Sequence, residues 1–310
     1  LPIYRTMGVV VAALLAAGLL GSWRALRRAP TVARSEAEPS LRAQLAVARD
    51  NPVFTALVAM WTVQALAVGV MLAGVQYFAT YVVGSPEAVT PLFACMIGPL
   101  VLMMPWWNRL ARARGTVFAQ WCASLLFTGA AALVFLTRYT SPWVGYVAVA
   151  LVGVAYAGLQ LLPLTMLADT LAADTARTGR RRAATFTGLW TAAETLALAL
   201  GSGVFAAVLA VTGFRSSEAS EEVAQPAAAL VGINAGMSLL PALLSLAGCA
   251  LLAVYARRSA AAPTSAPAPA PAPASASEDP PTAPIDLATP ATPATPAPNA
   301  TAQKGTRRVG

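Results

Sequence analysis

Two long apolar segments are joined by the charged stretch LADTLAADTARTGRRRAATFTGLW, which covers residues 167–190. It contains two acids, Asp169 and Asp174, and a glycine, Gly179, that is followed by three consecutive arginines. Charged side chains are costly in the hydrocarbon core of a bilayer. This pattern therefore predicts a hinge where the chain leaves the membrane, turns and enters it again.

The composition of the whole chain agrees with this interpretation. Of the 310 residues, 57% are hydrophobic, 11% are charged and none is histidine. A soluble protein needs more polar surface, so most apolar side chains are expected to face lipid. The net charge of +8 would suit nucleic-acid binding, but the basic residues lie in short loops between apolar segments, which is the pattern of membrane topology. The composition predicts an all-α, polytopic membrane protein that does not bind nucleic acid.

Seven apolar segments are long enough, at about 20 residues each, to cross a bilayer as helices. The arginines outside the C-terminal tail divide 15 to 3 between the two sides of these segments, and the richer side is expected in the cytoplasm. The N-terminus is then outside and the tail inside. The predicted spans are 3–23, 53–83, 90–107, 116–137, 143–168, 184–212 and 227–255.

These spans divide the chain into four predicted parts. Residues 1–23 form a single transmembrane helix, 24–52 a cytoplasmic loop and 53–258 a six-helix bundle. The loop is expected to hold a short amphipathic helix near 41–47. The tail, 259–310, is rich in Ala, Pro and Thr and has almost no large apolar residues to bury, so it is expected to be disordered or polyproline-like. The chain opens inside an apolar segment, which is expected of a fragment.

The hinge resembles that of the glycoside-pentoside-hexuronide cation symporters, the melibiose-permease-like branch of the major facilitator superfamily. In that family an Ala-Asp pair precedes further acids, a Thr-Gly turn and two arginines, and a Gly-Leu-Trp sequence follows. This chain has Ala168, Asp169, Asp174, Thr178, Gly179, Arg181, Arg182, Gly188, Leu189 and Trp190 at these places.

Two departures accompany the resemblance. Ala172 stands where an acid is common, and Ala183-Ala184 replaces a Glu-Gly pair. The order of one span, a long basic loop and six spans resembles the sixth helix, central loop and C-terminal half of a twelve-helix transporter. The resemblance thus implies a C-terminal six-helix bundle plus one preceding helix, and a missing N-terminal bundle as partner.

The same resemblance implies a function. It points to secondary active transport of a sugar or glycoside with a cation, by alternating access in the plasma membrane. The expected coupling ion is a proton or sodium, and no other cofactor is implied. The family commonly has a lysine at the position of Thr195, whereas the single lysine here is Lys304 in the tail. Coupling is therefore not expected to follow the usual family mechanism.

The charges of the hinge suggest a cytoplasmic gate. Acids near a helix C-terminus oppose its dipole and need nearby bases. We expect Asp169 and Asp174 to pair with Arg181, Arg182 or basic residues of other loops when the cytoplasmic side is shut. A solvated topology signal that never moves is the alternative.

Polar residues inside the spans predict the substrate site. In 184–212, hydroxyl side chains recur at intervals of four and seven residues beside Glu194, so they share one helical face, which should point into the protein. A carboxylate near mid-membrane costs roughly 3 kcal/mol and needs a partner or a function. Gln160 aligns with a sugar-facing aromatic residue of the resembling permease. The predicted substrate-binding residues are Trp61, Gln64, Tyr77, Gln160, Trp190, Thr191, Glu194 and Thr195.

Two alternatives remain open from the sequence. One is a non-transporting membrane scaffold or sensor, and the other is a transporter of a non-sugar amphiphile. An enzyme is not expected, because the chain has no histidine and no nucleophile placed beside a plausible base. The three cysteines are isolated in apolar segments, so no metal site is expected.

Overall fold

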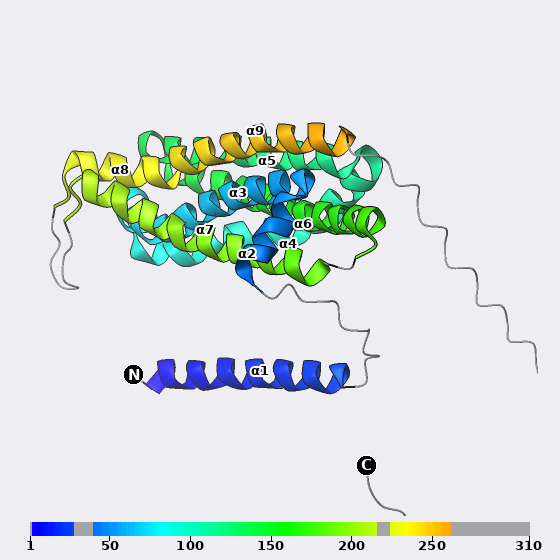
Figure 1. The fold of residues 1–310 in the computed structure, drawn as a ribbon. Helices are drawn as coiled ribbons and strands as arrows, with labels where there is room; N and C mark the ends of the chain where they lie inside the picture. The colour runs from blue at the N-terminus through cyan, green and yellow to red at the C-terminus, as the bar shows by residue number, and fades with distance from the viewer. Residues whose placement is uncertain (1, 28–39, 181, 216–223, 262–310) are drawn as a thin grey trace, which may run out of the picture. The chain divides into compact units, whose positions relative to one another are not determined.

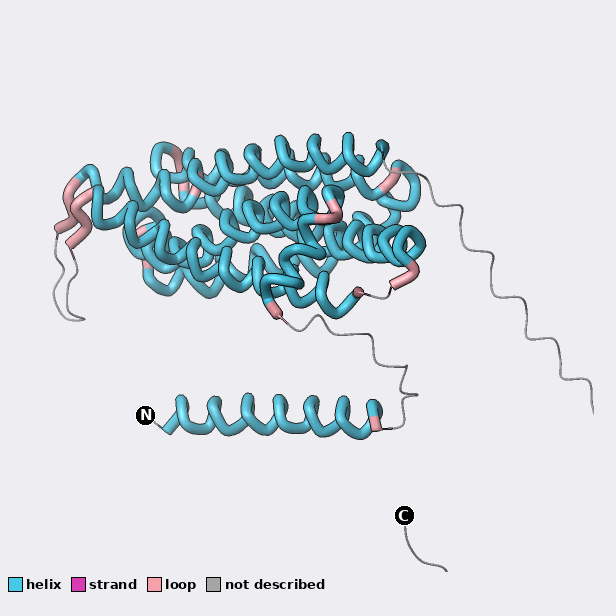
Figure 2. Tube along the Cα trace, viewed as in Figure 1, coloured by secondary structure: helices cyan, strands magenta, loops and turns pink. Residues whose placement is uncertain are grey.

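The computed structural model describes residues 2–27, 40–180, 182–215 and 224–261, and these ranges are helical apart from short turns (Figures 1 and 2). Most of the predicted tail therefore lies outside the described residues. Six helical stretches within them are long and apolar enough to cross a bilayer. The remaining predicted span, 3–23, falls inside helix α1, Pro2–Leu26.

The helices follow one another with short connections. α3 continues directly into a π-helical turn, η1, and α5 into a 3-10 turn, η3. Their bounds are α1 Pro2–Leu26, α2 Leu41–Arg49, α3 Pro52–Phe78, η1 Ala79–Val83, η2 Pro86–Ala88, α4 Val89–Arg114, α5 Thr116–Val134, η3 Phe135–Tyr139, α6 Pro142–Thr178, α7 Ala183–Val211, α8 Ala227–Met237 and α9 Leu239–Ala261.

Short polar side chains cap the N-termini of α2 and α3. The Ser40 hydroxyl accepts a hydrogen bond of 3.2 Å from the Ala43 N–H at the start of α2. Asn51 caps α3 in the same way through the Phe54 N–H, at 3.0 Å, and Pro52 occupies the first turn. Both are favoured N-terminal signals. The short helix predicted near 41–47 is confirmed as α2.

The hinge is more helical than the sequence suggested. α6 continues ten residues past the predicted end of its span, to Thr178. It stops at Gly179, whose left-handed conformation (φ 68°) and N–H bond to the Thr175 carbonyl form a common helix ending. Hydropathy marks where lipid contact ends, whereas alanine and leucine between the acids let the helix continue. The turn itself is confined to the few residues after Thr178.

The last predicted span, 227–255, is divided in two. The backbone leaves helical geometry at Ser238, between α8 and α9. The Ser238 hydroxyl donates to the Asn234 carbonyl, and the Asn234 amide donates to the Phe135 carbonyl at 2.9 Å. Polar side chains therefore satisfy backbone groups near the break, as a membrane interior requires.

The bundle packs as an open series of helices. Starting from α7, the extensive contacts run to α3, then α9, α5, α6 and finally α4, and α3 also touches α6. α3 and α6 thus lie inside the series, while α4 and α7 form its two ends.

Small residues bring α3 and α7 into backbone contact. A Cβ atom added to Gly201 would lie 2.6 Å from the backbone carbonyl carbon of Gly69, and one added to Gly69 would lie 2.8 Å from the Leu198 carbonyl oxygen. Such close approach is typical of small-residue helix contacts in membranes. This contact fixes α7, with Glu194 on it, against the centre of α3.

Candidate functional site

A polar pocket lies between α3, α6 and α7, close to the middle of each helix. Its free volume is about 20 Å³, room for roughly one water molecule, so the pocket is narrow in this conformation. Three helices from distant parts of the sequence contribute to it, which is typical of ligand sites in helical bundles. Its lining is formed by Trp61, Gln64, Ala65, Val68, Tyr156, Leu159, Gln160, Glu194 and Leu198.

Glu194 is the acidic side chain of this pocket. It is half-buried on α7, and no basic residue is among the described side chains that line the pocket. A carboxylate in such surroundings attracts a hydrogen-bond donor or a positive charge. The pocket therefore favours ligands with hydroxyl or ammonium groups.

Gln64 is held in place by a buried polar network. Its Nε2 donates to Ser124 Oγ at 2.8 Å, and its Oε1 accepts from Gln120 Nε2 at 3.1 Å. Thr128 Oγ1 in turn donates to Ser245 Oγ at 3.0 Å, which extends the network from α5 to α9. A carboxamide has two protons and two acceptor sites, so Gln64 keeps capacity for a ligand while its orientation is fixed.

Trp61 supplies the aromatic wall. Its ring stacks on Trp190 with centroids 4.9 Å apart and an interplanar angle of 14°. The Trp61 indole N–H is buried and has no hydrogen-bond partner among the described residues, which is uncommon for a buried donor. Trp190 is buried behind Trp61 and is not part of the pocket lining.

Besides Trp190, three more predicted substrate residues do not line the pocket. Thr191 and Thr195 are exposed on α7, and the Thr195 hydroxyl donates to the Thr191 carbonyl at 2.9 Å. The hydroxyl face is not covered by the described bundle, so the expectation that it points into the whole protein stays a prediction. Tyr77 packs against Phe205 and Phe214 at centroid distances of 5.6 and 5.4 Å, in an aromatic cluster separate from the pocket.

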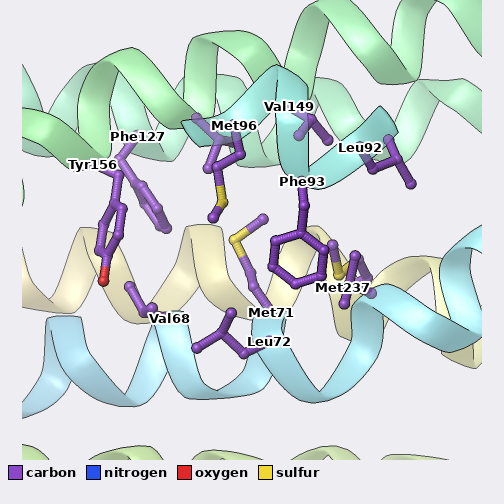
Figure 3. A pocket seen from close by; sticks show the side chains of 12 residues that line it. Val68, Met71, Leu72, Leu92, Phe93, Met96, Phe127, Val149, Tyr156 and Met237 are labelled. Carbon is purple, nitrogen blue, oxygen red and sulfur yellow. The ribbon is translucent and has the colours of Figure 1, made fainter. Parts of the chain in front are cut away.

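A second, apolar pocket adjoins the polar one (Figure 3). Val68 and Tyr156 line both. Its free volume is about 40 Å³, and the side chains of Met71 and Met96 point toward one another within it. Its other lining residues are Leu72, Val75, Leu92, Phe93, Phe127, Val149, Val152 and Met237.

The predicted gate residues form a different set of contacts. Asp174 is only 3% exposed and accepts at Oδ1 from Asn51 Nδ2 at 3.1 Å and from Arg177 Nη2 at 3.0 Å. Its Oδ2 has no partner among the described residues. Neither Asn51 nor Arg177 was predicted as a partner of Asp174. Asn51 lies 123 positions from it in the sequence, and Arg177 lies three residues after it on the same helix.

The other gate residues are not brought together with Asp174 in the described structure. Asp169 is exposed on α6. Arg182 is half-buried, and its Nε lacks a hydrogen-bond partner within the described ranges. Arg181 lies outside them. The gate therefore stays a prediction, with Asn51 as a contact that any opening motion must accommodate.

With this geometry established, comparison with known families identifies the chain. A family model described as MFS/sugar transport protein matches residues 2–256. The chain belongs to this family. Comparison with curated proteins returned no match. The family and the six apolar helices make it a multi-pass membrane transport protein, and the resemblance found in the hinge is confirmed.

Sequence reasoning missed two parts of this candidate site. The buried pair Gln120 and Ser124 left a signal, since polar residues four apart in an apolar span share one helical face. The apolar pocket left none, because Met71 and Met96 are apolar residues in an apolar chain. Tyr156, which lines both pockets, lies four residues before Gln160, and this spacing indicates that the two share a helical face.

Proposed function

We propose that this chain is the C-terminal half of a secondary active transporter that carries a sugar or glycoside with a cation by alternating access. One observation supports this most: a pocket in the middle of the bundle gathers Trp61, Gln64, Gln160 and Glu194 from three helices. Midplane sites of this kind are the usual binding sites of secondary transporters.

The chemistry of the pocket suits a hydroxylated ligand. The Gln64 and Gln160 amides and the Glu194 carboxylate offer donors and acceptors for hydroxyl groups. The Trp61 ring offers an apolar face for the C–H side of a pyranose. The family description, which names sugar transport, supports the same substrate class.

The hydroxyl face of α7 extends this proposal to the second half of the transporter. Thr191 and Thr195 are exposed next to Glu194, and we place them on an aqueous chamber that an N-terminal bundle completes. The coupling ion is a proton or sodium. The protein acts in the plasma membrane with its C-terminus in the cytoplasm, and Asp169, Asp174, Arg181 and Arg182 belong to its cytoplasmic gate.

A non-sugar amphiphile is the second candidate substrate. The adjoining apolar pocket favours it, because a small free sugar has no apolar part to place between Met71 and Met96. A lipid-like ligand without hydroxyl groups, in turn, leaves the polar pocket unused.

Uptake by the full-length protein in proteoliposomes tests the proposal. A panel of labelled glycosides and lipid-like amphiphiles is offered with and without a proton or sodium gradient. We expect gradient-dependent uptake of a glycoside that Gln160→Leu reduces about tenfold, the loss typical of a ligand hydrogen bond. Gln76→Leu, the same substitution at an exposed position of α3, is the control. Absence of uptake under every gradient would favour the scaffold or sensor.

A further inference from the structure

The electrostatics of the polar pocket discriminates among glycosides. Glu194 contributes a negative charge, and the described lining contains no arginine or lysine to balance it. A partly buried charge gains most from an opposite charge within a few ångströms, and a like charge is repelled. A sugar bearing an ammonium group fits this pocket better than a neutral sugar, and a uronate fits worst.

The position of the apolar pocket adds a second requirement. Val68 and Tyr156 belong to both linings, so the two pockets lie on either side of these side chains, and a ligand too long for the polar pocket reaches the apolar one when they move aside. Met71, Met96 and Met237 line that space beside Phe93 (Figure 3). Methionine side chains are flexible and polarisable, and they adapt to irregular apolar groups.

We infer that the substrate is a glycoside whose sugar carries a protonated amine and whose aglycone is apolar; this rests on the proposed transporter function. The ammonium group pairs with Glu194, and the sugar hydroxyls bond the Gln64 and Gln160 amides. The aglycone passes Val68 and lies between Met71 and Met96. The two pockets together thus set both the charge and the amphiphilic character of the ligand.

The first arm of the test varies the charge alone. Full-length protein in proteoliposomes is offered the 4-nitrophenyl glucosaminide, glucoside and glucuronide, at a pH where the amine is protonated and the uronate ionised. We expect the apparent affinity to fall about tenfold from amine to neutral sugar and about tenfold again to the uronate.

Glu194→Gln should abolish this order, because the amide keeps the shape of the side chain and removes its charge. Glu87→Gln removes a charge from the exposed turn η2, outside the pocket, and should leave the order unchanged. Thermal unfolding of each variant checks folding. Should Glu194→Gln not fold, Glu194→Asp, which retains the charge, should retain the order.

The second arm varies the aglycone alone. Free glucosamine should bind about tenfold more weakly than its 4-nitrophenyl glycoside. Val68→Phe narrows the passage between the pockets and should remove this difference, and Met96→Ala should reduce it. Val63→Phe on the same helix and Met104→Ala at an exposed site of α4 are the matched controls, since neither residue lines a pocket.

The outcomes separate this inference from the proposed function. Gradient-driven uptake with no preference for the amine, or with equal affinity for the free sugar, overturns the inference and leaves the transporter proposal standing. Uptake of no glycoside under any gradient overturns both. A charge order that survives Glu194→Gln also overturns the inference, because another group would then set it.

Discussion

α4 and α7 form the two ends of the packed series of helices, yet their uncovered sides differ. The share of residues buried in the most apolar stretch of each span is 11% for α4, 22% for α7 and 61% for α3 together with η1. The uncovered side of α4 carries Ile97, Val101 and Leu102. That of α7 carries Thr191, Thr195 and Ser202 as well as leucines. Lack of cover within one bundle therefore does not by itself mean contact with lipid.

The geometry of α7 separates its two exposed surfaces. At about 100° per residue, Thr191, Thr195 and Ser202 fall in one narrow arc next to Glu194. Leu196 and Leu200, which are also exposed, lie about 100° or more farther round the helix. We expect the leucines to face lipid, like Ile97, Val101 and Leu102 on the uncovered side of α4, while the hydroxyl arc faces the proposed chamber.

The largest expected effect comes from placing an arginine on each surface. Leu102→Arg, at the middle of α4, should lower the free energy of unfolding in lipid by about 3 kcal/mol, the cost of a buried charge in hydrocarbon. Ser202→Arg on α7 should cost less than about 1 kcal/mol if its side chain reaches water. Thermal unfolding in nanodiscs measures both. Equal losses would mean that α4 and α7 meet the same surroundings.

The next effect concerns what holds α7 to the bundle. Gly201→Val places atoms against the backbone of Gly69 and should cost about 2 kcal/mol through overpacking. Gly203→Val is the matched control, because a Cβ there meets nothing within 4 Å. Thermal unfolding of the purified variants compares them. If both valines are tolerated alike, the close contact of α7 with α3 is absent in the membrane.

The smallest expected effect on stability concerns Asn51, which bonds Asp174 in the hinge. Asn51→Ala removes the cap of α3 and the bond to Asp174, so it should lower the free energy of unfolding by about 1 kcal/mol. Asn108→Ala, at an exposed position of α4, should leave it unchanged. Denaturant or thermal titration of both variants tests this, and an unaffected Asn51→Ala protein would remove Asn51 as the link between α3 and α6.

Much of the fold was predictable because the bilayer imposes a strong pattern. About 20 apolar residues per span located the helices, and the charged stretch from Asp169 to Arg182 indicated the family. Hydropathy does not report where a helix ends in water, so the extension of α6 to Thr178 was missed. Nor does it report a break inside an apolar run, so Ser238 went unnoticed.

The site was predictable where polar residues stood out. Trp61, Gln64, Gln160 and Glu194 line one pocket; Gln64 and Glu194 stood out as polar residues in apolar spans, Trp61 as an aromatic one, and Gln160 through the family resemblance. Tyr77 failed to join them because an aromatic ring packs equally well against Phe205 and Phe214. The Asn51–Asp174 bond joins residues 123 positions apart, and such pairs depend on how the helices pack rather than on local pattern.

Water accessibility of α7 shows most directly whether its hydroxyl arc faces an aqueous chamber. In full-length protein with Cys95, Cys122 and Cys249 replaced by alanine, Thr195→Cys and Leu200→Cys are each reacted with a membrane-impermeant maleimide. We expect the Thr195→Cys protein to react at least about tenfold faster, because thiolates form and react in water, and a transported glycoside to slow this reaction. Equal, negligible labelling at both positions would contradict this expectation, since the hydroxyl arc would then lie against lipid or packed protein.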